Sequence, residues 1–95
     1  MSAPITCQID WRGVTIRIVF RRRRWNSDFD HLEITAMNDA QIPITETGYR
    51  SHFLPDGNVE EHGGPEAYVL AWLDHEADSA AWKKREEALR QMSLF

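Results

Sequence analysis

The N-terminal part of the chain contains two runs of alternating apolar and polar residues on either side of Arg12-Gly13. Such alternation is typical of two strands that each bury one face. A two-residue turn at this point pairs Trp11 with Val14, and the same register places the alternating apolar residues of both runs on one side, with Val19 on the other. The residues on that side are Ile5, Cys7, Ile9, Trp11, Val14, Ile16, Ile18 and Phe20. The sequence therefore predicts an antiparallel hairpin with one apolar face and one polar face.

Two further extended segments are expected after this hairpin. A third strand is predicted at about 30–37, and Asn38-Asp39 then favours a turn. Its inward-facing residues are Leu32, Ile34 and Ala36. A fourth extended segment is predicted at 42–46, and Pro43 places it at an edge of the sheet or in irregular extended chain, because proline cannot donate a backbone hydrogen bond.

The C-terminal part predicts helices, because residues 66–90 contain neither glycine nor proline. Pro65 suits the first residue of a helix, and Asp78 or Ser79 suits the cap of a second one. The first helix is expected to face the sheet with Tyr68, Val69, Trp72 and Leu73, and the second with Ala81, Trp82, Arg85, Ala88, Leu89 and Met92. The predicted fold is α+β: an N-terminal antiparallel sheet of about four strands, followed by one or two C-terminal helices packed on one face.

Composition limits the size of the protein and its surroundings. A chain of 95 residues with 42% hydrophobic residues supports a single core, so we expect one domain at 1–90 and a separate terminal peptide at 91–95. The lone Cys7 reads as a small core residue, and the absence of a leader or a long apolar run predicts a cytoplasmic protein without a membrane span. The four histidines lack metal-site spacing and are expected at the surface or boundary, so neither metal nor cofactor is predicted. The oligomeric state stays open.

Charge is distributed unevenly along the chain, whose net charge is −4. Residues 1–25 carry six arginines and one acidic residue, whereas residues 26–81 carry twelve acidic residues and one arginine. The net negative charge argues against general nucleic-acid binding. The fold must place a basic element beside an acidic one or present two opposite faces.

The last five residues carry the strongest functional signal. Gln91-Met92-Ser93-Leu94-Phe95 resembles the motif Gln-Leu-Ser/Asp-Leu-Phe, by which bacterial replication and repair proteins bind the ring-shaped sliding clamp, the beta subunit of DNA polymerase III. The resemblance implies that Gln91 is the polar anchor, that Met92 replaces the usual leucine, that Ser93 is a small linker, and that Leu94 and Phe95 fill an apolar cleft of the clamp. The alternative is that these side chains continue the apolar stripe of the second helix onto the core. We expect an interaction protein that docks on the clamp in replication, repair or mobile-element maintenance.

The basic run Arg21-Arg22-Arg23-Arg24-Trp25 is a second candidate site. If the strand ends near Arg22, the arginines that follow lie in a loop where they would contact a phosphate backbone, with Trp25 available for stacking. The alternative is a set of charges at the end of an edge strand that discourage aggregation and pair with the acidic middle of the chain. The overall acidity favours this second interpretation, with weak DNA contact as the alternative.

The segment 45–53 is a third candidate, because it is rich in hydrogen-bonding side chains. Together with His31 and Glu33 on the neighbouring strand, it would assemble a polar site for ligand binding or catalysis. The candidate residues of this site are Glu46, Tyr49, Arg50 and His52. A nucleophile with a base at a recognised spacing is missing, so we do not expect an enzyme. The body of the chain resembles an uncharacterised family of small bacterial proteins, some of them carried on mobile elements, and this resemblance implies no activity.

Overall fold

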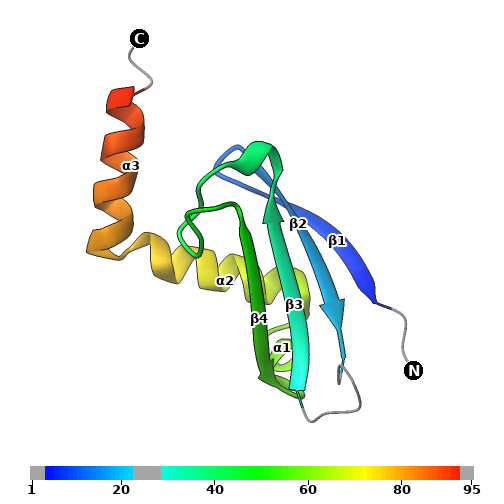
Figure 1. Cartoon of the computed structure of the whole chain (residues 1–95). Coiled ribbons are helices and arrows are strands. Elements are labelled where there is room, and N and C mark those ends of the chain that lie inside the picture. Colours follow the sequence, from blue (N-terminus) through cyan, green and yellow to red (C-terminus); the bar gives the residue numbers. More distant parts are fainter. Residues whose placement is uncertain (1–3, 23–28, 93–95) are drawn as a thin grey trace.

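The computed structural model describes residues 4–22 and 29–92, which form an antiparallel sheet with helices on one of its faces (Figure 1). The strands lie side by side in the order of the sequence, as β1 (Ile5–Trp11), β2 (Val14–Arg21), β3 (Phe29–Ala36) and β4 (Tyr49–Pro55). A short 3₁₀ helix, η2 (Met37–Asp39), follows β3. The helices after β4 are α1 (Asn58–Glu61), α2 (Pro65–Ala77) and α3 (Ala80–Met92). The predicted α+β architecture is confirmed.

The N-terminal hairpin has the predicted register, with Trp11 opposite Val14 and Cys7 opposite Ile18. Arg12 and Gly13 have φ angles of 47° and 82°, the positive values that a two-residue type I′ turn requires. Glycine adopts this conformation without steric cost, whereas arginine does so against the preference of its Cβ atom. The turn length therefore decides which side chains of β1 and β2 face the core.

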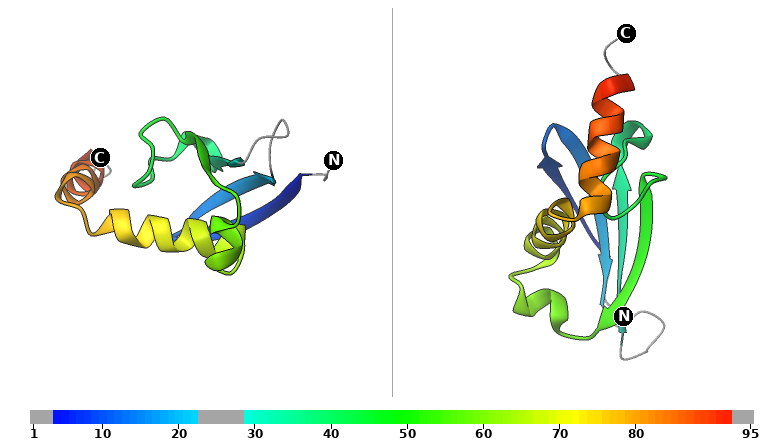
Figure 2. Two further views of the ribbon diagram at one scale, coloured as in Figure 1. Left: turned by 90° about the horizontal axis from the view of Figure 1, so that it is seen from below. Right: turned by 90° about the vertical axis from the view of Figure 1, so that its left-hand side faces the viewer.

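The inner face of the sheet, defined as the face that α2 covers, carries the hydrophobic core (Figure 2). Its centre consists of fully buried side chains from β2, β3 and α2, namely Ile16, Ile18, Leu32, Ile34, Val69 and Leu73. Cys7 lies half-buried against this core, and burial, with a smaller effect of Glu66, raises the pKa of its thiol. Ile5 shares the inner register but is 50% exposed. The apolar alternation of the hairpin thus predicted the inner face correctly, except that Ile5, at the start of β1, is half exposed.

The fourth strand lies later in the chain than the predicted segment 42–46. Ile42 and Thr45 form only an isolated bridge, and the strand that pairs with β3 is β4. Ile42 and Ile44 are nevertheless buried, because they contribute to the core from irregular extended chain. The alternating apolar residues around Pro43 therefore indicated burial and not strand pairing.

The helices begin and end close to the predicted positions. Pro65 is the first residue of α2, and the Ser79 hydroxyl accepts a hydrogen bond of 3.1 Å from the backbone N–H of Trp82 at the start of α3. The short helix α1 lies between β4 and α2. Within the described ranges, no helix is sufficiently long and apolar to cross a bilayer.

Helix α3 projects from the body and does not lie along the sheet (Figures 1 and 2). Trp82 is 4% exposed, whereas Ala81 and Ala88 are exposed, so the predicted core-facing stripe was wrong for these two alanines. The molecule measures 50 × 24 × 19 Å. Its radius of gyration is 14.4 Å, compared with about 12 Å for a compact chain of this length. The projecting helix accounts for the elongated shape.

Candidate functional site

Helix α3 carries the C-terminal segment and is attached to the body near its own N-terminal end. The indole of Trp82 packs against that of Trp11, with ring centroids 6.0 Å apart. The guanidinium of Arg85 lies 5.0 Å from the Trp82 ring centroid and donates a hydrogen bond of 3.1 Å to the carbonyl oxygen of Ile42. It also pairs with the carboxylate of Glu46 at 3.2 Å. Glu46, predicted as part of a polar site, therefore helps to hold α3.

The predicted docking peptide begins in the last turn of α3. The side chain of Gln91 is exposed, and Met92 is the last residue of the helix. In Figure 1 this end of α3 points away from the sheet, whereas Leu89 and Arg90, one turn earlier, line a groove with Trp11 and Val14. Outside the described residues lie Ser93, Leu94 and Phe95. The docking role of the peptide stays a prediction.

The basic run divides where β2 ends. Arg21 donates a hydrogen bond of 3.0 Å to Glu33 of β3, and Arg22 donates one of 2.6 Å to Glu60 of α1. The predicted pairing with the acidic middle of the chain is therefore confirmed for these two arginines. The interpretation as an edge strand was wrong, because β2 lies between β1 and β3. Outside the described residues lie Arg23, Arg24 and Trp25.

Strand β4 separates the predicted polar-site residues, because successive side chains of a strand point to opposite faces. Arg50 and His52 share the inner register and contact α2, where the Arg50 guanidinium and the His52 ring lie 5.6 Å and 4.5 Å from the Trp72 ring centroid. Tyr49 has the opposite register and is 49% exposed. The predicted site around Glu46, Arg50 and His52 is not assembled as one cluster with Tyr49.

Burial and, to a smaller extent, the nearby Arg50 cation lower the pKa of His52. The unfolded chain then binds a proton at His52 more readily than the folded protein does. The contribution of His52 to stability is therefore complete above its unfolded pKa of about 6.5, and it is lost as the pH falls through the lower folded value. We expect His52→Gln to show a smaller decrease in Tm than the unchanged protein between about pH 7.5 and pH 5. Equal decreases in thermal melts would contradict this expectation.

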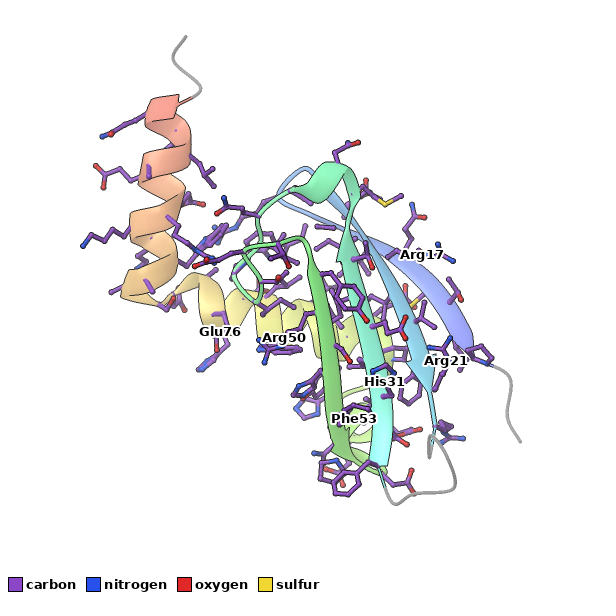
Figure 3. The ribbon with its side chains drawn as sticks, in the orientation of Figure 1. Arg17, Arg21, His31, Arg50, Phe53 and Glu76 are labelled. Atoms are coloured by element: carbon purple, nitrogen blue, oxygen red, sulfur yellow. The ribbon has the colours of Figure 1, made fainter. Side chains whose placement is uncertain are left out.

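The outer face, defined as the face opposite α2, carries a cluster of polar and aromatic side chains from β2, β3 and β4 (Figure 3). His31 is 3% exposed, and its Nε2 atom lies 2.7 Å from the Ser51 Oγ atom. Its ring centroid lies 4.5 Å from that of Phe53, and its Nδ1 atom lies 3.8 Å from Glu33 Oε1. Arg21 binds the same Glu33 oxygen. We call these five residues the outer-face cluster.

The outer-face cluster corrects the prediction that every histidine lies at the surface or boundary, because His31 is buried. The register places His31 opposite Phe53 and Glu33 opposite Ser51. The sequence pointed to His31 and Glu33 as neighbours of segment 45–53. It did not identify Ser51 and Phe53 as their partners, because the fourth strand was placed too early in the chain.

The geometry of the outer-face cluster does not match that of an acyl-transfer triad. The neighbouring side chains of a catalytic triad are a nucleophile, a base and a carboxylate, and on the outer face these types are represented by Ser51, His31 and Glu33. However, 3.8 Å from His31 Nδ1 to Glu33 Oε1 exceeds hydrogen-bond length. Ser51 is also exposed on an open sheet surface, and acyl transfer requires donors arranged around a developing oxyanion.

Comparison with known proteins places the chain in a family. No curated protein and no solved structure matches it significantly. Residues 4–82 match the family model described as the KlcB third domain. This range includes the sheet, α1, α2 and the start of α3, whereas the rest of α3 and the segment 91–95 lie beyond it. Because the match covers most of the chain, the protein belongs to the KlcB third-domain family.

Proposed function

We propose that this protein is a small bacterial interaction protein that docks on the sliding clamp through residues 91–95. Docking would hold the KlcB third-domain body close to DNA, in replication, repair or mobile-element maintenance. The observation that carries the proposal is the sequence Gln91-Met92-Ser93-Leu94-Phe95, which follows a helix that projects from the body (Figure 1).

The position of the peptide supports this proposal in two ways. The family match ends at residue 82, so the peptide lies outside the matched part of the chain. Gln91, the predicted polar anchor, is exposed and available to a partner. Met92 suits a leucine subsite, because its unbranched side chain adapts to the shape of a pocket.

The energetics favour weak and exchangeable docking. Burial of the two large apolar side chains Leu94 and Phe95 would contribute about 3–6 kcal/mol before the cost of ordering them. Entry of Gln91 and Met92 into a cleft disrupts at most the last turn of α3, which costs little because terminal carbonyl groups already lack helical partners. On their own, these two side chains would give a dissociation constant between roughly tens of micromolar and millimolar, so the docking is weak and exchangeable.

Titration of the protein into purified bacterial sliding clamp tests the proposal. Calorimetry should show saturable binding by the unchanged protein, and the double variant Gln91→Ala/Phe95→Ala should bind at least about tenfold more weakly, because about 1.4 kcal/mol of lost burial has this effect. Glu87→Ala is the matched control, since Glu87 is an exposed residue of the same helix. It should bind like the unchanged protein.

Two results of this titration would contradict clamp docking. One is equal affinity of the double variant and the unchanged protein, which would place the contact elsewhere on the molecule. The other is the absence of binding by both proteins, provided that circular dichroism shows both to be folded.

A further inference from the structure

Two rows of side chains cross the outer face of the sheet, and each runs from an arginine on β2 to an aromatic ring on β4. The register places Arg21 and Phe53 on either side of His31. It likewise places Arg17 and Tyr49 on either side of Thr35, which follows His31 by four positions on β3. At the usual rise per residue, the two rows lie about 13 Å apart.

The aromatic side chains of these rows are accessible to solvent. Tyr49 and Phe53 are each 49% exposed, and Phe29, at the start of β3 on the same face, is 50% exposed. Helices α1 and α2 lie on the other side of the sheet, and α3 projects from the body (Figure 2). A group of exposed aromatic residues on one face indicates a binding surface, because monomeric proteins seldom leave large apolar patches uncovered.

The buried His31 side chain supports the ring of Phe53 from below. The two ring centroids lie 4.5 Å apart, and His31 is itself positioned next to the Ser51 hydroxyl at 2.7 Å. A ring that is held in this way loses less side-chain freedom when a ligand stacks on it. The contact with His31 therefore restricts the ring of Phe53 on one side.

Acidic residues are concentrated in the helical segment of the chain, and the outer face carries an exposed arginine. Nine acidic and four basic residues belong to segment 56–92, which forms the helical side of the sheet. The outer register of the strands carries two carboxylates and two guanidinium groups: Asp10 accepts a hydrogen bond of 3.0 Å from Thr15, and Glu33 accepts one from Arg21. In the described part of the chain, no carboxylate pairs with the exposed Arg17.

From these observations we infer that the outer face binds single-stranded nucleic acid. Bases stack on Tyr49 and Phe53, while Arg17 and Arg21 contact the phosphate backbone. Stacking on aromatic rings is tolerant of sequence, and the arginines add a salt-dependent attraction. Unpaired bases are required, because paired bases do not expose their flat faces to a protein surface. This binding site is separate from the proposed clamp-docking peptide.

A second copy of this chain fits the same face less well. In a twofold dimer, identical surfaces meet, so Arg17 and Arg21 of both copies would lie in one interface. Desolvation of Arg17, which has no carboxylate partner among the described residues, is costly, and the repulsion between the two copies of Arg17 adds to this cost. A polyanion with exposed planar groups provides both a counter-charge and a stacking partner.

Fluorescence anisotropy with a labelled oligothymidine of about 15 nucleotides tests the inference on the full chain without clamp. At low salt the unchanged protein should bind. Tyr49→Ala and Phe53→Ala should each weaken binding roughly five- to hundredfold. Arg17→Ala should reduce the slope of log affinity against log salt by about 0.7. A duplex of the same length should compete poorly.

Two control variants make the result specific. Ile5→Ala removes an equally exposed apolar side chain from the inner register of β1, and it should bind like the unchanged protein. Gln91→Ala/Phe95→Ala should retain nucleic-acid binding, so this inference and the clamp proposal can fail separately. Phe53 also covers His31, so Phe53→Ala exposes this histidine as well as removing a stacking surface. Tyr49→Ala removes only a stacking surface and is therefore the decisive variant.

Three results would overturn the inference. The first is the absence of binding at low salt by the unchanged protein. The second is unchanged affinity of Tyr49→Ala. The third is a concentration-dependent dimer in sedimentation equilibrium that Tyr49→Ala abolishes, which would assign the face to a second copy of this chain.

Discussion

Replacement of Trp82 by alanine is expected to lower the free energy of unfolding by about 3–5 kcal/mol. Trp82 is 4% exposed, packs against Trp11 and lies beneath the guanidinium of Arg85. Its removal leaves a cavity at the point where α3 meets the body and removes the surface on which Arg85 is positioned. Urea denaturation measures the loss, and amide hydrogen exchange across 83–92 should become faster because α3 is released.

Trp82→Phe is the matched variant for this prediction. The buried indole N–H of Trp82 has no hydrogen-bond acceptor among the described residues, and an unsatisfied buried donor costs about 1–3 kcal/mol. Phenylalanine removes this donor while it keeps most of the apolar contact with Trp11. We expect Trp82→Phe to remain within about 1.5 kcal/mol of the unchanged protein. Equal destabilisation by the two variants would show that the ring contact does not hold α3.

Leu32→Ala is expected to destabilise the protein by about 2–5 kcal/mol. Leu32 is completely buried on the inner face of β3, between β2 and β4. The shortened side chain loses its transfer free energy and leaves a cavity that a close-packed sheet cannot collapse fully.

Thr35→Ala is the control on the same strand, because Thr35 is exposed on the outer face. It should change the free energy of unfolding by no more than about 0.5 kcal/mol. Chemical denaturation of both variants measures the difference. Comparable losses would mean that the inner face of β3 is not the core of the sheet.

The hairpin was predictable because its determinants are local. A period of two decides which side chains share a face, and a two-residue turn decides the register, so Trp11 and Val14 pair wherever the rest of the chain lies. The boundary between α2 and α3 was predictable for the same reason. The Ser79 side chain bonds to the backbone of Trp82 only three residues away.

The fourth strand was not predictable by the same pattern. Only Leu54 among the β4 residues is buried, so β4 lacks the apolar alternation that marks a strand. Ile42 and Ile44 do alternate, but they are buried without joining the sheet. A strand at the edge of a sheet is stabilised by backbone hydrogen bonds with one neighbour. These bonds do not require a particular side-chain pattern, so the sequence does not reveal them.

The candidate surfaces depend on the position of β4, which the sequence did not reveal. The sequence showed His31, Glu33 and an arginine run, but the outer-face cluster also needs Ser51 and Phe53, which only the pairing of β3 with β4 brings alongside. The predicted grouping of Glu46, Arg50 and His52 with Tyr49 failed because strand geometry alternates faces.

By itself, the sequence determined the α+β class, the hairpin register and most of the core, because these follow from local periodicity, turn length and composition. The tertiary structure alone decided that one face of the sheet carries exposed aromatic residues and that α3 projects from the body. Both features result from contacts between residues far apart in the chain, such as Trp11 with Trp82 and Ile42 with Arg85. Such contacts depend on the shape of the whole fold, which no local pattern specifies.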